Sequence, residues 1–260
     1  KLFVGTGGGV GSTYYVFSLT NYALLFQTNF NVPPPVAFPG WLHTMHYDGK
    51  YVWGGGYITK PGVIRIDPTN GYATSYVSIT NAGNVYGVVL NDGTSTGIFK
   101  VTDDMAALGN WLYLGTEDTN GIVTRIHRDT LEVQRIRSGA SGPCYGVFAI
   151  GNMVYATYPS ASVVDTNSGA IVRIDPATLR VDLFRAPAGV NEIHSDGTSF
   201  YVTTYDANTN KSLLVRIPEL EFNSVATFYA STNGSFRQDI DASGNLNSNP
   251  YTVAAIYGKI

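Results

Sequence analysis

Val63-Ile64-Arg65-Ile66-Asp67-Pro68 is the first of four copies of a phrase that decides the fold. The other copies are Val123-Thr124-Arg125-Ile126-His127-Arg128, Ile171-Val172-Arg173-Ile174-Asp175-Pro176 and Leu214-Val215-Arg216-Ile217-Pro218. Their arginines lie 60, 48 and 43 residues apart. Apolar and polar residues alternate in each copy, which is typical of a half-buried strand. Recurrence at this spacing indicates a repeat fold.

A glycine turn followed by an aromatic-rich strand lies upstream of each arginine phrase. The four copies are Asp48-Gly49-Lys50-Tyr51-Val52-Trp53, Leu108-Gly109-Asn110-Trp111-Leu112-Tyr113, Ile150-Gly151-Asn152-Met153-Val154-Tyr155 and Asp196-Gly197-Thr198-Ser199-Phe200-Tyr201-Val202. One short strand precedes each turn and another follows each arginine phrase, so each unit has four strands. A period of about 40–45 residues is that of a propeller blade. The sequence therefore predicts an all-β fold in which residues 1–260 form a single β-propeller.

Five four-stranded blades are predicted, and the last is built from both ends of the chain. Residues 251–260 read as a first strand entering a glycine turn, and Leu2-Phe3-Val4-Gly5 reads as the second strand that should follow it. Joining them would remove an exposed sheet edge. The predicted blades cover residues 251–260 with 1–30, 41–80, 103–138, 143–186 and 190–230.

The longest interval between arginine phrases contains an insert, residues 85–101. Asn91-Asp92-Gly93 between two apolar runs predicts a hairpin. A degenerate sixth blade is the alternative. Because a free two-stranded ribbon is only marginally stable, we expect either the propeller itself or another protein subunit to cover this hairpin. Residues 29–40 and 230–250 are predicted to be long surface loops.

The repeats resemble those of YVTN and NHL-type β-propeller proteins. Tyr201-Val202-Thr203-Thr204 and Val154-Tyr155-Ala156-Thr157 carry this resemblance, together with the arginine phrases. It covers most of the chain and implies the fold alone, since the superfamily includes lyases, hydrolases, adhesion modules and scaffolds. No catalytic motif of the family can be carried over residue by residue.

Composition excludes several classes of partner. Charged residues make up 13% of the chain and the net charge is −3, so no basic surface for nucleic acid is expected. No run of 18 apolar residues exists, so no membrane insertion is expected. The only cysteine, Cys144, allows no intrachain disulfide. A surface rich in Tyr, Asn, Ser and Thr is typical of extracellular, cell-surface or virion proteins.

Two apparent ligand motifs have simpler explanations. The glycine run between Gly5 and Gly11 precedes a strand, whereas a dinucleotide fingerprint requires a helix at that point. His43 and His46 lie three residues apart on a predicted strand, so their side chains face opposite sides and cannot bind one metal ion together. We therefore predict neither a metal site nor another cofactor.

Aligning the first strands on their glycine turns brings five polar residues to one level of the predicted channel. These residues are His43, Asp103, Tyr145, Asn191 and Thr252. Because the first strand of each blade lines the channel, they are predicted to form a polar ring near one mouth, which is a natural ligand site. The neighbouring polar residues are His46, Asp104, Glu192 and His194. Solvation of a water-filled channel is the alternative role.

Two functions fit these patterns. The first is a non-enzymatic binding or structural module of an extracellular or virion-surface assembly, in contact with other protein subunits through hairpin 85–101 or with a glycan. The second is a hydrolase or lyase acting on a glycan or small molecule, with His43 as general base and Asp103 or Glu192 as its partner. The sequence favours the first because it contains no complete catalytic constellation. The recurring arginines are predicted to be structural.

Overall fold

The computed structural model describes most of the repeat region of the chain. The described residues are 1–6, 13–29, 40–58, 62–79, 84–86, 101–116, 121–140, 142–159, 168–206, 211–218, 224–230 and 236–238. All regular elements in these stretches are strands, and none of them contains a helix able to cross a membrane.

The strands form five sheets. The first sheet contains β1 (Leu2–Thr6), β2 (Thr13–Phe17) and β3 (Leu24–Asn29). The second contains β4 (Gly40–Tyr47), β5 (Val52–Ile58), β6 (Gly62–Asp67) and β7 (Ala73–Ser78). The third contains β8 (Asn84–Tyr86), β9 (Val101–Leu108), β10 (Trp111–Thr116), β11 (Ile122–His127) and β12 (Val133–Arg137).

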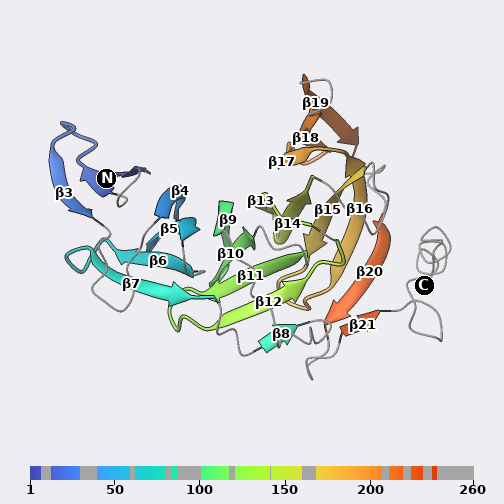
Figure 1. Cartoon of the computed structure of the whole chain (residues 1–260), viewed down its shortest axis with the longest axis horizontal. Coiled ribbons are helices and arrows are strands. Elements are labelled where there is room, and N and C mark those ends of the chain that lie inside the picture. Colours follow the sequence, from blue (N-terminus) through green and yellow to red (C-terminus); the bar gives the residue numbers. More distant parts are fainter. Residues whose placement is uncertain are drawn as a thin grey trace.

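The remaining strands form the last two sheets. The fourth sheet contains β13 (Gly146–Ile150), β14 (Met153–Tyr158), β15 (Ser168–Ile174), β16 (Val181–Pro187), β20 (Ser224–Ala230) and β21 (Phe236–Gln238). The fifth contains β17 (Val190–Ser195), β18 (Ser199–Asp206) and β19 (Lys211–Pro218). Figure 1 shows the five sheets following one another around an arc from β1–β3 to β17–β19. The propeller-like arrangement of antiparallel sheets is as predicted, whereas closure into five blades stays a prediction.

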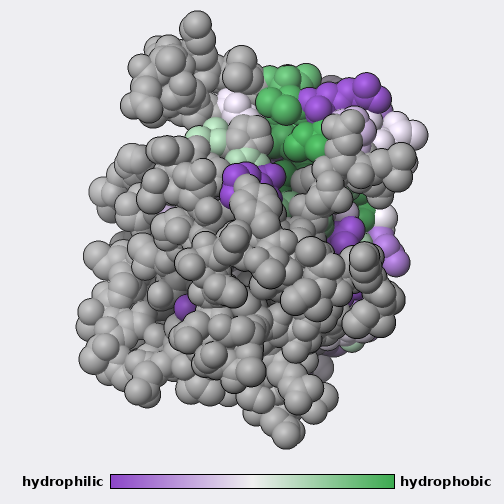
Figure 2. Space-filling view, turned by 90° about the vertical axis from the view of Figure 1, so that its right-hand side faces the viewer, coloured by the Kyte–Doolittle hydropathy of each residue, from purple (hydrophilic) through white to green (hydrophobic). Residues whose placement is uncertain are grey.

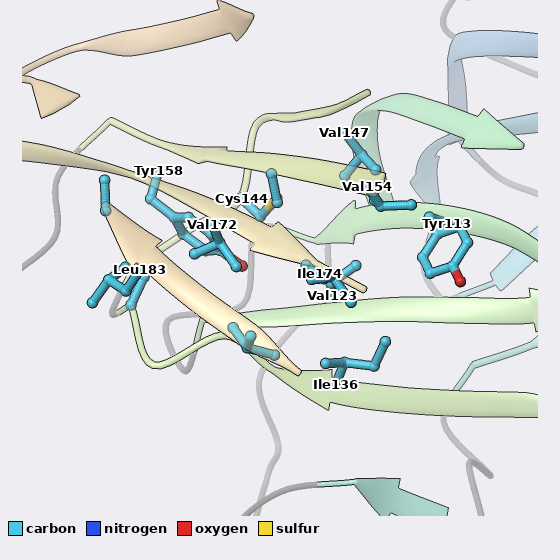
Figure 3. Packing of buried hydrophobic residues seen from close by; sticks show 14 of the residues in the cluster. Tyr113, Val123, Ile136, Cys144, Val147, Val154, Tyr158, Val172, Ile174 and Leu183 are labelled. Carbon is cyan, nitrogen blue, oxygen red and sulfur yellow. The ribbon is translucent and has the colours of Figure 1, made fainter. Parts of the chain in front are cut away.

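The apolar core lies between successive sheets. One cluster joins the third and fourth sheets, and Figure 3 shows Tyr113, Val123 and Ile136 facing Val147 and Val172 across that junction. A second cluster spans the first three sheets and a third joins the fourth and fifth. Packing sheet against sheet in this way is what repeat proteins use, because one repeat alone cannot bury its apolar face.

The turns between outer strands share one backbone device. A non-glycine residue with positive φ closes this turn in four sheets: Tyr22, Tyr72, Leu131 and Leu179. The Asp67 and Asp175 carboxylates accept hydrogen bonds from backbone N–H groups two and three residues further on, as in Asx turns. His127 has the same role in the third sheet, where its Nδ1 accepts the Thr130 N–H at 3.2 Å. This histidine is therefore structural.

Two of the recurring arginines link one sheet to the next, in a contact that we call the arginine clasp. Arg65 Nη1 donates to the Arg128 carbonyl at 2.9 Å, and Arg125 Nη1 donates to the Pro176 carbonyl at 3.1 Å. Each guanidinium also lies over an aromatic ring of its own sheet, that of Tyr51 or Trp111. The prediction of a structural role is confirmed for these two arginines.

Three predicted segments differ in the structure. The strand expected to complete the 190–230 blade, β20, pairs with β16 of the preceding sheet and not with β19. The first residues of the predicted hairpin form β8, which pairs in parallel with β12; residues 87–100 lie outside the described residues. Within the predicted loop 230–250, β21 is a strand paired with β20. In all three cases the outer edge strand of a sheet, whose backbone groups would otherwise be unpaired, pairs with another strand. The alternation of apolar and polar residues along one strand does not show which strand will add to such an edge.

Candidate functional site

A cavity of about 600 Å³ lies against the inner strands β9, β13 and β17 and reaches β4. We call it the inner-strand cavity. Its polar lining includes His46, Asp104 and His194, and Phe148 contributes an aromatic ring. These residues come from four successive sheets, so the cavity depends on the way in which the sheets follow one another (Figure 1).

Asp104 is the most perturbed carboxyl of this cavity. Burial raises its pKa to about 6, and the negative charge of Glu192 acts in the same direction. Hydrogen bonds from the backbone N–H groups of Met105 and Val147 oppose that rise; the Met105 N–H lies 2.8 Å from Asp104 Oδ1. Because Val147 belongs to β13, Asp104 also links the third sheet to the fourth.

Glu192 and His194 form the solvent-facing part of the site. Glu192 Oε2 lies 3.8 Å from His194 Nε2, and both side chains are more than half exposed. The His194 imidazole lies 5.6 Å from the Phe148 ring, measured between ring centroids. An acidic group and an imidazole are thus held beside an aromatic surface, while remaining open to a ligand.

Gly146 allows the inner strands β13 and β17 to approach each other closely. It lies on β13, between the strands that carry Asp104 and Glu192. A Cβ atom at this position would lie only 2.5 Å from the Asn191 carbonyl oxygen of β17. The close approach of β13 and β17 therefore requires glycine here.

His46 borders the cavity from β4. Burial lowers the pKa of its imidazole, and the carboxylate of Asp48 acts in the opposite direction. Asp48 is itself fixed, because its Oδ2 accepts the Trp53 Nε1–H at 2.7 Å and lies 3.6 Å from Arg128 Nη1. At neutral pH, His46 therefore offers a neutral imidazole that can donate and accept hydrogen bonds.

The predicted ring is only partly placed. His43 and Asp103 lie on β4 and β9, Asn191 is exposed on β17, and Tyr145 is half-buried just before β13. Thr252 lies outside the described residues. A ligand site at these five positions stays a prediction.

The inner strands contain irregularities at the ring positions. The β4–β5 register shifts between Leu42 and Thr44, the β9–β10 register shifts around residues 102–104, and the β17–β18 register shifts between Val190 and Ile193. A bulge adds an unpaired residue and changes where side chains point. Simple alternation therefore could not show that Asp104 borders the cavity. The useful signal is the group of ionisable residues that follow the ring positions by one residue, Asp104 and Glu192, or by three, His46 and His194.

Neither a metal cluster nor a reactive cysteine is found among the described residues. No group of three or more His, Cys, Asp or Glu side chains within them is arranged to hold a metal ion. Cys144 is fully buried, and burial raises the pKa of its thiol to about 12, so it is not a nucleophile at neutral pH. The inner-strand cavity is therefore the candidate functional site.

Comparison with known proteins supports the fold and assigns no activity. No protein-family model and no curated protein matches the chain. The CNH domain of AfRom2 superposes with a TM-score of 0.51 at 11% identity, over 84% of this chain and 60% of that one. This chain thus spans less than two thirds of that structure.

Two further solved structures are similar at lower TM-scores. The Pan2 WD40 domain of Neurospora crassa has a TM-score of 0.47 and 10% identity, over 87% of this chain and 68% of that chain. The β-propeller domain of Cps50 (Swd1) from Myceliophteria thermophila has a TM-score of 0.36 and 12% identity, over 89% and 91%. The fold-level resemblance that the repeats predicted is confirmed by the superposition on the AfRom2 CNH domain, and it concerns the fold alone.

Proposed function

We propose that the chain is a non-enzymatic protein-interaction module whose inner-strand cavity receives a basic side chain of a partner protein. One observation carries this proposal: the Asp104 carboxyl and the Phe148 ring line the same cavity, and the negative charge of Glu192 acts on Asp104 from the neighbouring strand β17. An ammonium or guanidinium group is attracted both by carboxylates and by an aromatic face. Because the fold gives no function by itself, the proposal depends on this cavity.

The charge of the cavity supports a cationic ligand at neutral pH. A carboxyl with a pKa of about 6, such as that of Asp104, is mostly ionised at pH 7.4. Burial keeps His46 neutral, so it does not cancel this charge. A bound cation favours the ionised form of Asp104. Affinity should therefore fall when the pH decreases through 6, as the carboxyl takes up a proton.

The setting of this interaction is part of the same proposal. We place the module in an extracellular or virion-surface assembly, because few of its residues are charged and its polar surface is rich in Tyr, Asn, Ser and Thr. Contact with another subunit through residues 85–101 belongs to the proposal as well. Figure 2 shows a group of exposed hydrophobic residues near the top of the molecule, the level at which Figure 1 places β17–β19. Leu214 of β19 is 69% exposed.

A hydrolase or lyase acting on a glycan or small molecule is the second candidate. The raised pKa of Asp104 beside a second carboxyl favours it, since glycosidases pair an acid with a carboxylate in this way. The hydrogen bonds of Asp104 weigh against it. Two backbone N–H groups already engage this carboxyl, whereas a general acid must present its proton to a substrate.

Titration with N-acetyl-arginine amide, followed by NMR at pH 7.4, tests the proposal. Glu192→Gln should weaken binding about fivefold or more, because it removes a charge-assisted contact. Glu132→Gln is the matched control, since Glu132 is an exposed carboxylate in the β11–β12 turn and should leave the affinity unchanged. Equal affinities for both variants would contradict the proposal. Hydrolysis of an aryl glycoside by the parent, lost in Asp104→Asn, would establish the enzyme instead.

A further inference from the structure

The first sheet departs from the repeat at the arginine position. The positive-φ residues Tyr22 and Tyr72 mark the same turn in the first and second sheets. Val16 lies six residues before Tyr22, as Arg125 lies six before Leu131 and Arg173 six before Leu179; the second sheet has a turn one residue longer, so Arg65 lies seven before Tyr72. The cross-strand pairs agree, because Phe3 pairs with Val16 as Trp53 pairs with Arg65. The first sheet therefore has a short apolar side chain in place of a clasp arginine.

With valine at this position, another residue donates the hydrogen bond that a clasp arginine makes to the turn of the next sheet. Pro68 stands at the turn position that Arg128 and Pro176 occupy in the next two sheets, where clasp arginines donate to the carbonyl. At Pro68 the donor is Lys1 Nζ, 3.3 Å from the carbonyl oxygen. Lys1 stands two residues before Phe3, as Tyr51 stands before Trp53. The first sheet thus lacks both the guanidinium and the ring beneath it.

A second cavity, which we call the seam cavity, lies where the first sheet meets the second, beside Lys1 and Pro68. Its volume is about 510 Å³, and its lining includes Lys1, Phe3, His46, Tyr47 and Pro68. The rings of Phe3 and Tyr47 are stacked with centroids 5.8 Å apart. Tyr47 is 53% exposed, and its hydroxyl donates to the Gly49 carbonyl, so the ring face is presented in a fixed orientation.

We propose that the seam cavity binds a carboxylated sugar unit of a glycan. The C–H face of a sugar ring packs on an exposed aromatic ring, here that of Tyr47, and the Lys1 ammonium attracts the carboxylate. His46 and the Pro68 carbonyl supply polar partners for sugar hydroxyls. A basic side chain, the other group that could fill the place of an arginine, is repelled by Lys1. This site is separate from the proposed protein-binding site, although His46 borders both cavities.

Titration with D-glucuronate, and with D-glucose as the neutral analogue, tests this inference by saturation-transfer NMR. The parent should bind glucuronate about tenfold more tightly than glucose, which is the size of one charge-assisted contact. Lys1→Met should abolish that preference. Tyr47→Ala should weaken both sugars, whereas Tyr22→Ala should weaken neither, because Tyr22 is an exposed tyrosine in the β2–β3 turn.

Two further variants separate the inference from its alternatives. Val16→Arg restores the repeat residue, and its guanidinium should displace Lys1 from the Pro68 carbonyl and weaken glucuronate binding; Tyr47→Ala tests the same site without a substitution in the core. Glucuronate binding should survive Glu192→Gln, which distinguishes the seam cavity from the inner-strand cavity. Equal binding of glucuronate and glucose by the parent, or equal losses in Tyr22→Ala and Tyr47→Ala, would overturn the proposal.

Discussion

The arginine clasp should contribute measurably to stability, and Arg125 provides the cleanest test. Its side chain is only 6% exposed. Arg125 donates to the Pro176 carbonyl at 3.1 Å, to Gln134 Oε1 at 2.8 Å and to the Tyr113 hydroxyl at 3.3 Å. Its guanidinium carbon lies 4.1 Å from the centroid of the Trp111 ring. Arg125→Met keeps much of the stem packing and removes all of these polar contacts.

The expected loss follows from these contacts. The hydrogen bonds from the charged guanidinium contribute about 1.5–3 kcal/mol in total, because Arg125→Met leaves their acceptors buried without this donor. The contact with the ring adds about 0.5–1 kcal/mol. The variant also avoids the desolvation cost of burying a charged guanidinium, which offsets part of this loss. We therefore expect the free energy of unfolding to fall by about 2–3 kcal/mol, which lowers Tm by about 5–10 °C in a domain of this size.

Arg216→Met is the matched control for this prediction. Arg216 occupies the same repeat position but is exposed, and its Nε donates at 3.1 Å to Ser199 Oγ within its own sheet. It should cost less than about 1 kcal/mol. Urea unfolding monitored by tryptophan fluorescence, with thermal melts followed by circular dichroism, measures both variants. If the two variants unfold within about 0.5 kcal/mol of each other, a difference within ordinary surface scatter, the clasp does not stabilise the junction as argued.

Two further predictions concern the pH dependence of stability and the closure of the propeller. Because the pKa of Asp104 is raised from 3.8 to about 6, the folded protein binds this proton more tightly, and stability should fall as the pH rises from about 4 to about 6. After discounting for partial solvent exposure this amounts to about 1–2 kcal/mol, and urea unfolding across that range should show it in the parent and not in Asp104→Asn. Deletion of residues 251–260 should cause aggregation or loss of cooperative unfolding, because it would expose the inner edge of β1; a truncated protein that melts like the parent would contradict closure.

The strands and their packing could be predicted because every repeat faces the same physical problem. Each blade must bury an apolar face against its neighbours, so alternation and turn residues recur with the repeat. The role of the arginines followed from the same reasoning, and the contacts of Arg65 and Arg125 confirm it. Pairings at the outer edges could not be predicted in this way. The strands β8 and β20 add to edges that belong to other parts of the chain.

The candidate site was only partly predictable for a different reason. An alignment of first strands finds equivalent residues, and the cross-strand partners of Met45, Met105, Val147 and Ile193 confirm that alignment. The direction in which the side chains of the preceding residues point depends on local β-bulges. A bulge within a stretch of polar residues cannot be recognised from the sequence. Burial also matters, because it is burial that raises the pKa of Asp104 to about 6. Neither effect can be read from residue type alone.

The first sheet shows which of its strands lacks a neighbour. Its outer turn contains the positive-φ residue Tyr22, as the turns between third and fourth strands do in other sheets. β2 and β3 therefore correspond to third and fourth strands, and β1 corresponds to a second strand. Among the described residues no strand pairs with the inner edge of β1. A first strand is consequently missing from the described part of this sheet.

Residues 251–260 have the pattern expected of that first strand. Gly258-Lys259-Ile260 resembles Gly49-Lys50-Tyr51, a glycine turn followed by the start of a second strand. Under the predicted closure, the turn that is continuous in other blades is divided between two distant chain segments in this one. Lys1 then lies at the division and also borders the seam cavity. Under that closure, pairing between residues 251–260 and β1 would hold this blade together. The junction between this blade and the second sheet is also where Val16 replaces a clasp arginine and where the seam cavity lies.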